Sequence, residues 1–334
     1  MNIKELLQER ILILDGAMGT MIQRHRLTEE DFRGDRFRYS NIDLKGNNDL
    51  LSITRPDIIQ GIHEEYLEAG ADIVGTNTFS GTTVAQADYE LESAVYDINY
   101  ESARIAKLAC EKYTKKDSSK PRFVAGAMGP TNKTCSLSPD VSRPEYRAIN
   151  FDQLKEAYKL QAQGLIDGGA DVLIIETIFD TLNAKSALFA VLELYEETGT
   201  ERPIMISGTI TDASGRTLSG QTVEAFLISL SHAPLLSIGF NCALGAKQLK
   251  PYLKNLADRS PFFISAYPNA GLPNEFGEYD QGPDAMAKEV EAYLQDGIVN
   301  ILGGCCGTDP EHIKKMVEVA SRYEPRRITK EIVA

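Results

Sequence analysis

The sequence predicts an α/β protein with a (β/α)8 (TIM) barrel, and three observations support this fold class. Eight short apolar runs are spaced along the chain, and helical segments lie between them. Each run is apolar at consecutive positions, which is typical of parallel strands buried on both faces. The long polar segments follow the runs rather than precede them. This arrangement indicates long loops at the C-terminal face of the strands, where such barrels hold their sites.

The predicted elements alternate regularly along the chain. The strands are expected at residues 11–15, 72–77, 123–129, 172–177, 204–209, 235–242, 262–269 and 299–306. Apolar residues recur with helical periodicity at residues 58–69, 154–166, 182–195, 224–231, 286–294 and 312–319. Repeated alternation of strand and helix implies a parallel sheet that closes into a barrel.

The connections between these elements differ at the two ends of the barrel. Helix-to-strand junctions are short, and three contain a glycine (Gly70, Gly169 and Gly297) suited to the left-handed conformation that ends a helix. Polar insertions follow strands at residues 23–54, 131–150, 211–221 and 270–284. We expect one barrel domain over residues 1–324 and the start of a linker or C-terminal tail at 325–334.

Composition and charge exclude several classes of partner. The net charge of the 334 residues is -13, which disfavours binding to nucleic acid or to an anionic membrane surface. No apolar run reaches the roughly 18–20 residues of a membrane span. The N-terminal residues mix charged and apolar side chains and lack the apolar core of a signal peptide. We therefore expect a cytoplasmic protein.

The cysteines suggest a metal site. There are five, and an odd number without an export signal argues against a disulfide framework. Cys242 ends the sixth predicted strand, and Cys305 and Cys306 end the eighth. In a closed barrel only the seventh strand separates them, so the three sulfurs should converge at one mouth. Three thiolates favour Zn²⁺ and leave its fourth position open, as in catalytic sites.

Other interpretations of these cysteines are weaker. A redox disulfide between Cys305 and Cys306 would be unusual in a reducing compartment. A closed structural zinc site needs a fourth fixed ligand, and no further Cys or His occupies a matching strand end. A phosphate loop at residues 302–304 would leave both cysteines unexplained and place thiolates beside an anion. Cys110 fits packing within a helix, and Cys135, after the third strand, is interpreted as incidental.

Several motifs resemble a known family. The sequence Gly-Phe-Asn-Cys at 239–242, with Gly-Gly-Cys-Cys-Gly-Thr at 303–308, resembles the zinc signature of the homocysteine S-methyltransferases. Residues 14–20 resemble the first-strand motif of that family. Residues 43–50, 208–220 and 267–273 resemble one subgroup, the N-terminal homocysteine-binding modules of cobalamin-dependent methionine synthases. The resemblance covers nearly the whole chain.

This resemblance implies a specific activity. The chain would bind homocysteine through Zn²⁺ and activate it as a thiolate for methyl transfer, giving methionine. The donor would be methylcobalamin, recharged from 5-methyltetrahydrofolate. Cobalamin- and folate-binding modules of the same or a partner chain would supply it. Since those modules do not follow within these residues, one alternative is a stand-alone homocysteine S-methyltransferase that uses a sulfonium donor such as S-methylmethionine. An alternative of another class is a non-catalytic zinc-binding barrel scaffold.

Residues at other strand ends are candidates to bind the zwitterionic part of homocysteine. Asp15 and Glu176 end the first and fourth predicted strands, and either carboxylate suits the ammonium group. Asp15 has the alternative role of capping a turn. A charged group such as Glu176 after an apolar run is costly unless it is paired. Backbone amides in Gly16, Ala17 and Met18, or in residues 126–129, suit the carboxylate.

Asn269 ends the seventh strand, between the two cysteine-bearing strands. Its side-chain oxygen is a candidate for the fourth zinc position before homocysteine displaces it, because an amide is a weak ligand beside thiolates. The alternative is that Asn269 only stabilises the turn at residues 268–271. Strand alternation predicts that Asn241 points away from the side of Cys242.

Overall fold

The computed structural model describes residues 2–211 and 214–328. Across these residues each predicted strand is present, although several are shorter than expected. The strands are β1 (Leu12–Ile13), β2 (Ile73–Gly75), β3 (Phe123–Met128), β4 (Val172–Ile178), β5 (Ile204–Gly208), β6 (Leu235–Gly245), β7 (Phe263–Asn269) and β8 (Ile301–Leu302).

The strands form one parallel sheet that closes on itself. Their order is β1-β8-β7-β6-β5-β4-β3-β2, and an isolated parallel bridge between Leu14 and Ile73 joins the two ends. Two further backbone bonds, Asp15 N to Ile73 O and Asp72 N to Ile13 O, support this closure. The predicted barrel is therefore confirmed.

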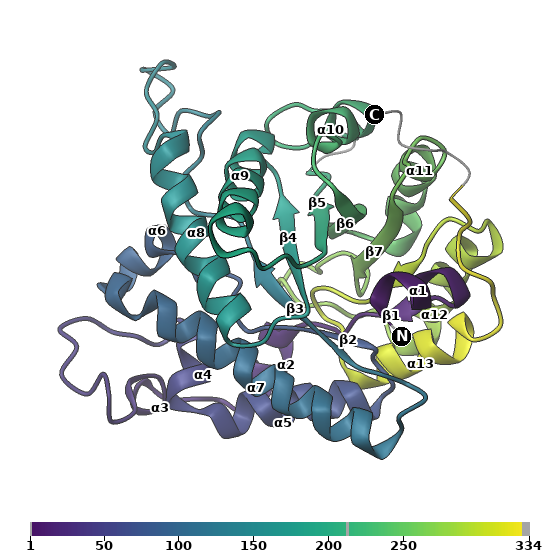
Figure 1. Cartoon of the computed structure of the whole chain (residues 1–334), viewed down its shortest axis with the longest axis horizontal. Helices are drawn as coiled ribbons and strands as arrows, with labels where there is room; N and C mark the ends of the chain where they lie inside the picture. Colours follow the sequence, from purple (N-terminus) through teal and green to yellow (C-terminus); the bar gives the residue numbers. More distant parts are fainter. Residues whose placement is uncertain (1, 212–213, 329–334) are drawn as a thin grey trace.

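Helices surround the barrel, and all six helical segments predicted from periodicity are present. The helices are α1 (Ile3–Glu9), α2 (Met18–Arg24), α3 (Glu29–Arg33), α4 (Leu51–Thr54), α5 (Pro56–Glu68), α6 (Thr83–Gln86), α7 (Val95–Lys116), α8 (Phe151–Asp167), α9 (Thr181–Thr198), α10 (Val223–Leu230), α11 (Ala246–Ala257), α12 (Pro283–Gln295) and α13 (Pro310–Ala320). Figure 1 shows the longer helices in a ring outside the strands. No helix within the described ranges is long and apolar enough to cross a membrane.

The core has two layers, which the alternation of side chains along each strand produces. One layer fills the barrel interior and includes Leu12, Val172 and Met205. Leu6 and Leu7 of α1 belong to the same cluster, so this N-terminal helix packs against the interior residues. The larger layer lies between the strands and the surrounding helices.

Glycines at the junctions have the expected conformation. Gly70, Gly169 and Gly297 all have positive φ, at 106°, 104° and 60°. In β6, Gly239 is required for close packing of the strands, because a Cβ there would lie 1.8 Å from the Ser265 carbonyl oxygen of β7. Only a hydrogen atom fits between these two strands.

The segment expected to begin a tail is described only as far as residue 328. Within it, Arg326 is buried and donates to the carbonyl oxygens of Phe262, Ala257 and Ser260. The boundary between barrel and tail stays a prediction, and residues 329–334 lie outside the described part of the chain.

Candidate functional site

A cavity of about 610 Å³ opens at the carboxyl ends of the strands. Parallel strands place these ends at one mouth, so residues distant in sequence meet there. The lining includes eight of the nine residues proposed from sequence: Asp15, Gly16, Ala17, Met18, Glu176, Cys242, Cys305 and Cys306. Asn269 is not among the lining residues, but its side-chain oxygen accepts a hydrogen bond from Cys306 N.

The three cysteines converge as a compact cluster. The sulfurs of Cys242, Cys305 and Cys306 all lie within 4.8 Å of one another, and the sulfurs of Cys242 and Cys306 are 3.7 Å apart. All five cysteines, which fall within the described residues, are free thiols. Cys110 is buried in α7, and Cys135 is buried in the loop after β3, where its N–H donates to Asn183. Three convergent sulfurs match the ligand set of a soft metal ion.

The end of β6 is distorted where it carries its cysteine. Cys242 and Ala243 have φ values of 59° and 55°, and the register between β6 and β7 shifts between Asn241 and Gly245. Positive φ is uncommon for residues with a side chain and marks local strain. Strand alternation cannot be extrapolated through such a segment. The Asn241 side chain accordingly reaches the cluster, 3.9 Å from the Cys305 sulfur, which corrects the expectation that it points away.

Shared hydrogen bonds make the three thiols inequivalent. Contacts from Cys242 and then Cys305 lower the pKa of Cys306 well below its usual value. Contacts with Cys242 and then Cys306, followed by burial, raise the pKa of Cys305. For Cys242, the contact with Cys305 lowers the pKa, but the contact with Cys306 and burial together raise it to about 11. Three thiolates this close together would repel one another, and a cation among them would relieve that repulsion.

Two carboxyl groups line the cavity, Asp15 buried and Glu176 partly buried. Asp15 accepts a 2.9 Å hydrogen bond from Gly75 N, and Glu176 accepts one of 3.2 Å from the Tyr267 hydroxyl. Burial raises the pKa of Asp15 well above its usual value, and the charge of Glu176 adds to the rise. Burial likewise raises the pKa of Glu176 to about 7. A cationic ligand would stabilise both carboxylates.

The loop after β1 follows Asp15 into α2. A Cβ at Gly16 would lie 2.8 Å from both Thr308 and Tyr66, so the chain is packed too closely for a larger residue. Ala17 N donates to Thr308 Oγ1 at 3.2 Å. This bond leaves the amides of Gly16 and Met18 as the better candidates for a ligand carboxylate.

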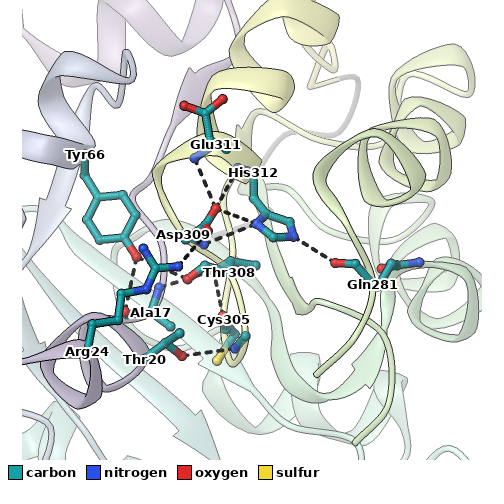
Figure 2. Close-up of polar contacts among 11 residues, drawn as sticks. Ala17, Thr20, Arg24, Tyr66, Gln281, Cys305, Thr308, Asp309, Glu311 and His312 are labelled. Atoms are coloured by element: carbon teal, nitrogen blue, oxygen red, sulfur yellow. Dashed lines mark hydrogen bonds and ion pairs between the residues drawn. The ribbon is translucent and has the colours of Figure 1, made fainter. Parts of the chain in front are cut away.

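Figure 2 shows how this loop is tied to the cysteine loop after β8. Thr308 Oγ1 accepts from Ala17 N and donates to the Cys305 carbonyl oxygen at 2.7 Å. The Tyr66 hydroxyl lies 3.1 Å from the Ala17 carbonyl oxygen and 3.3 Å from that of Thr308. Gly307 N donates to Thr20 Oγ1 at 3.2 Å. The amides proposed for the ligand are thus held in a defined position relative to the sulfurs.

Asn269 contacts the cysteine loop rather than only its own turn. Its Oδ1 accepts from Cys306 N at 3.1 Å, and its Nδ2 lies 3.5 Å from the Tyr279 hydroxyl. Tyr279 in turn hydrogen-bonds to the Cys306 sulfur. This bond uses one of the two lone pairs of the Asn269 oxygen, and the other stays available to a metal ion. The role of Asn269 as a metal ligand stays a prediction.

Sequence reasoning missed three polar side chains of this site. Asn241 and Tyr267 lie within the motifs that carry the family resemblance, at residues 239–242 and 267–273. Their place in these motifs could have identified them as candidate site residues. Tyr279 lies in the long loop after β7, where no periodicity indicates direction. All three are positioned by contacts between different strand ends.

Comparison with known proteins identifies relatives of this chain. A family model described as homocysteine S-methyltransferase matches residues 12–320. The metallated homocysteine methyltransferase MmuM from Escherichia coli is similar in structure, with 23% identity and a TM-score of 0.71, over 95% of this chain and 98% of that one. Its oxidised form gives 22% identity and a TM-score of 0.71, over 92% and 95% of the two chains. At such identities, the structural likeness shows the fold.

Proposed function

The chain belongs to the homocysteine S-methyltransferase family and is therefore a methyltransferase, and we propose that it activates homocysteine as a thiolate to give methionine. The observation that carries this proposal is the cluster of three sulfurs in a cavity that is also lined by the carboxyl groups of Asp15 and Glu176. The sulfurs suit a thiol-binding metal, and the carboxyl groups suit the ammonium group of an amino acid.

The residues fit Zn²⁺ as the metal. Cys242, Cys305 and Cys306 would hold it, and three protein ligands leave one position for the substrate sulfur. When bound, Zn²⁺ would replace the thiol proton of homocysteine and so provide a nucleophilic sulfur at neutral pH. Before substrate binds, we place Asn269 Oδ1 or a water in the fourth position.

The remaining groups would bind the backbone of the amino acid. Asp15 and Glu176 would accept hydrogen bonds from the ammonium group, and the Tyr267 hydroxyl holds Glu176 in place. Gly16 and Met18 would bind the carboxylate through their amides, and Ala17 N, which donates to Thr308, would hold the loop between them in position. These contacts would place the sulfur of homocysteine next to the three cysteine sulfurs.

For the methyl donor, we favour methylcobalamin presented by another module and recharged from 5-methyltetrahydrofolate. Residues Gly46, Asn48, Asp49 and Tyr267, from the segments that resemble methionine synthases, line the cavity. The partners would be cobalamin- and folate-binding modules. A cytoplasmic location is part of this proposal, because clustered thiols stay reduced there.

A second candidate is a stand-alone enzyme with a sulfonium donor such as S-methylmethionine. Two observations favour it. The cavity is larger than one small amino acid fills, and Asp49 adds a further buried carboxyl group with a pKa raised by burial to about 7. An anionic wall of this kind suits a cationic donor. Production of methionine from homocysteine with methylcobalamin or with S-methylmethionine would separate the two candidates.

Zinc-edge X-ray absorption with and without homocysteine tests the core of the proposal. We expect three sulfurs plus one oxygen or nitrogen without substrate, and four sulfurs with homocysteine. Cys110→Ala, a substitution in α7, serves as the control and should give the same spectra. Four sulfurs in the absence of homocysteine would contradict the open position, and an unchanged spectrum on its addition would favour the non-catalytic scaffold.

A further inference from the structure

Asn241 has an environment that the proposed function leaves unexplained. It lies near the end of β6, beside Cys242, and its side chain is 1% exposed. Its amide contacts Thr177 after Glu176 in β4, Ser207 in β5 and Cys305 after β8. A single side chain therefore links the ends of β4 and β5 to the sulfur cluster.

The orientation of this amide follows from a backbone donor. Asn241 Oδ1 lies 3.1 Å from Thr177 N, and a backbone N–H can only donate, so the amide atom facing it must be the oxygen. Ser207 Oγ donates to the same oxygen at 2.6 Å. The NH2 group therefore faces the other way, toward Thr177 Oγ1 at 2.8 Å and Cys305 Sγ at 3.9 Å. Asn241 thus presents an N–H, and not a carbonyl oxygen, to the sulfur.

The backbone on both sides of this contact is strained. Thr177 has a φ of 54°, an outlier for a β-branched residue, and Cys242 has a φ of 59°. Such conformations persist where surrounding contacts impose them, and they concentrate at functional sites. The Asn241 amide bonds both the backbone N–H and the hydroxyl of Thr177, so it holds one of these strained residues directly.

The negative charge of the metal-bound cluster explains why an N–H group should face the Cys305 sulfur. Three thiolates and a divalent cation leave one formal negative charge, and a homocysteine thiolate adds a second. The Cys305 sulfur meets a donor from outside the trio, the side-chain amide of Asn241. Hydrogen bonds to ionised groups are stronger than neutral ones, so they stabilise the excess charge.

We propose that Asn241 is a positioning residue that donates a hydrogen bond to the Cys305 thiolate and thereby sets the electron density on that sulfur when a metal is bound. This inference rests on the proposed function, because it requires the cysteines to act as metal ligands. It assigns a role to a buried side chain that is not among the residues lining the cavity.

The test uses the whole chain loaded with Co²⁺, whose thiolate charge-transfer absorption reports on the sulfur. Asn241→Ala removes the donor, and Asn241→Asp keeps the shape and both acceptor contacts while placing a negative charge beside the sulfur. In both variants we expect the band to move to longer wavelength, because an unbonded thiolate is easier to oxidise. Chelator competition should show metal affinity falling by roughly 10–100-fold in Asn241→Ala, as is typical when groups supporting metal ligands are lost.

Asn99→Ala is the matched control. Asn99, in α7, is also fully buried, but its Nδ2 donates to the carbonyl oxygens of Gly81 and Val95 and not to a sulfur. Its band should stay at the position found without substitution. An unshifted band in both Asn241 variants, or an equal shift in Asn99→Ala, would overturn the inference and leave the proposed function standing. Failure of the unsubstituted protein to bind Co²⁺ would overturn both.

Discussion

Glu176→Gln should stabilise the ligand-free protein at neutral pH and weaken its binding of homocysteine. Folding raises the pKa of Glu176 from 4.5 to about 7, chiefly because burial disfavours the ionised form. A carboxyl group with a raised folded-state pKa favours folding below the unfolded-state value, and this contribution is lost as pH rises through the folded-state value. The unfolding free energy that Glu176→Gln gains over the unsubstituted protein should therefore be absent below pH 4.5. It should grow between pH 4.5 and 7 and then stay constant.

The size of this effect follows from the same values. A rise from 4.5 to about 7 corresponds to about 3–4 kcal/mol of unfolding free energy, at about 1.4 kcal/mol per pKa unit. Glu176 also borders the open cavity, where water moderates the cost of its charge, so we expect roughly 1–3 kcal/mol. Glutamine can still accept the Tyr267 hydrogen bond. Loss of a charged partner for the ammonium group should weaken homocysteine binding by about 2–5 kcal/mol, or roughly 30-fold or more.

Urea unfolding at pH 5 and pH 8 measures the first effect, and calorimetric titration with homocysteine measures the second. Glu275→Gln removes the same charge from an exposed position in the loop after β7 and should change stability by less than about 0.5 kcal/mol at either pH. Equal stability of Glu176→Gln and the unsubstituted protein at pH 8 would refute the assigned cost of burial. Unchanged homocysteine affinity would refute the role of Glu176 in binding the ammonium group.

Three further substitutions test other parts of the structure. Cys305→Ala should abolish zinc retention while the far-UV circular dichroism stays unchanged, and methyl transfer by a metal-free variant would contradict the metal site. Asp15→Asn should weaken homocysteine binding far more than zinc binding, measured by paired titrations; equal losses would instead indicate a structural role. Gly239→Ala should destabilise the barrel in urea by about 1–3 kcal/mol, because its Cβ would lie 1.8 Å from the Ser265 carbonyl oxygen. A change below 0.5 kcal/mol, on the order of surface substitutions, would show that β6 and β7 can separate at little cost.

The sequence by itself determined the order of elements and the convergence of the cysteines. Apolar runs marked the strands because a parallel strand is buried on both faces, and this requirement acts on each short segment separately. Once a closed parallel barrel was inferred, topology brought Cys242, Cys305 and Cys306 to one mouth without knowledge of any side-chain contact. Asp15 and Glu176 followed from the same strand-end reasoning, and both line the cavity.

Only the tertiary structure decided the lengths of the strands and the directions of the polar side chains. β1 and β8 are only two residues long. Next to β1, Leu14 pairs with Ile73 through an isolated bridge and not as part of a continuous strand. The left-handed backbone at Cys242 ends the alternation of β6, and the Cys242 sulfur and the Asn241 amide both reach the cluster although the two residues are adjacent. Alternation predicts direction only while a backbone stays extended, and here contacts between strands that are distant in sequence impose the departure.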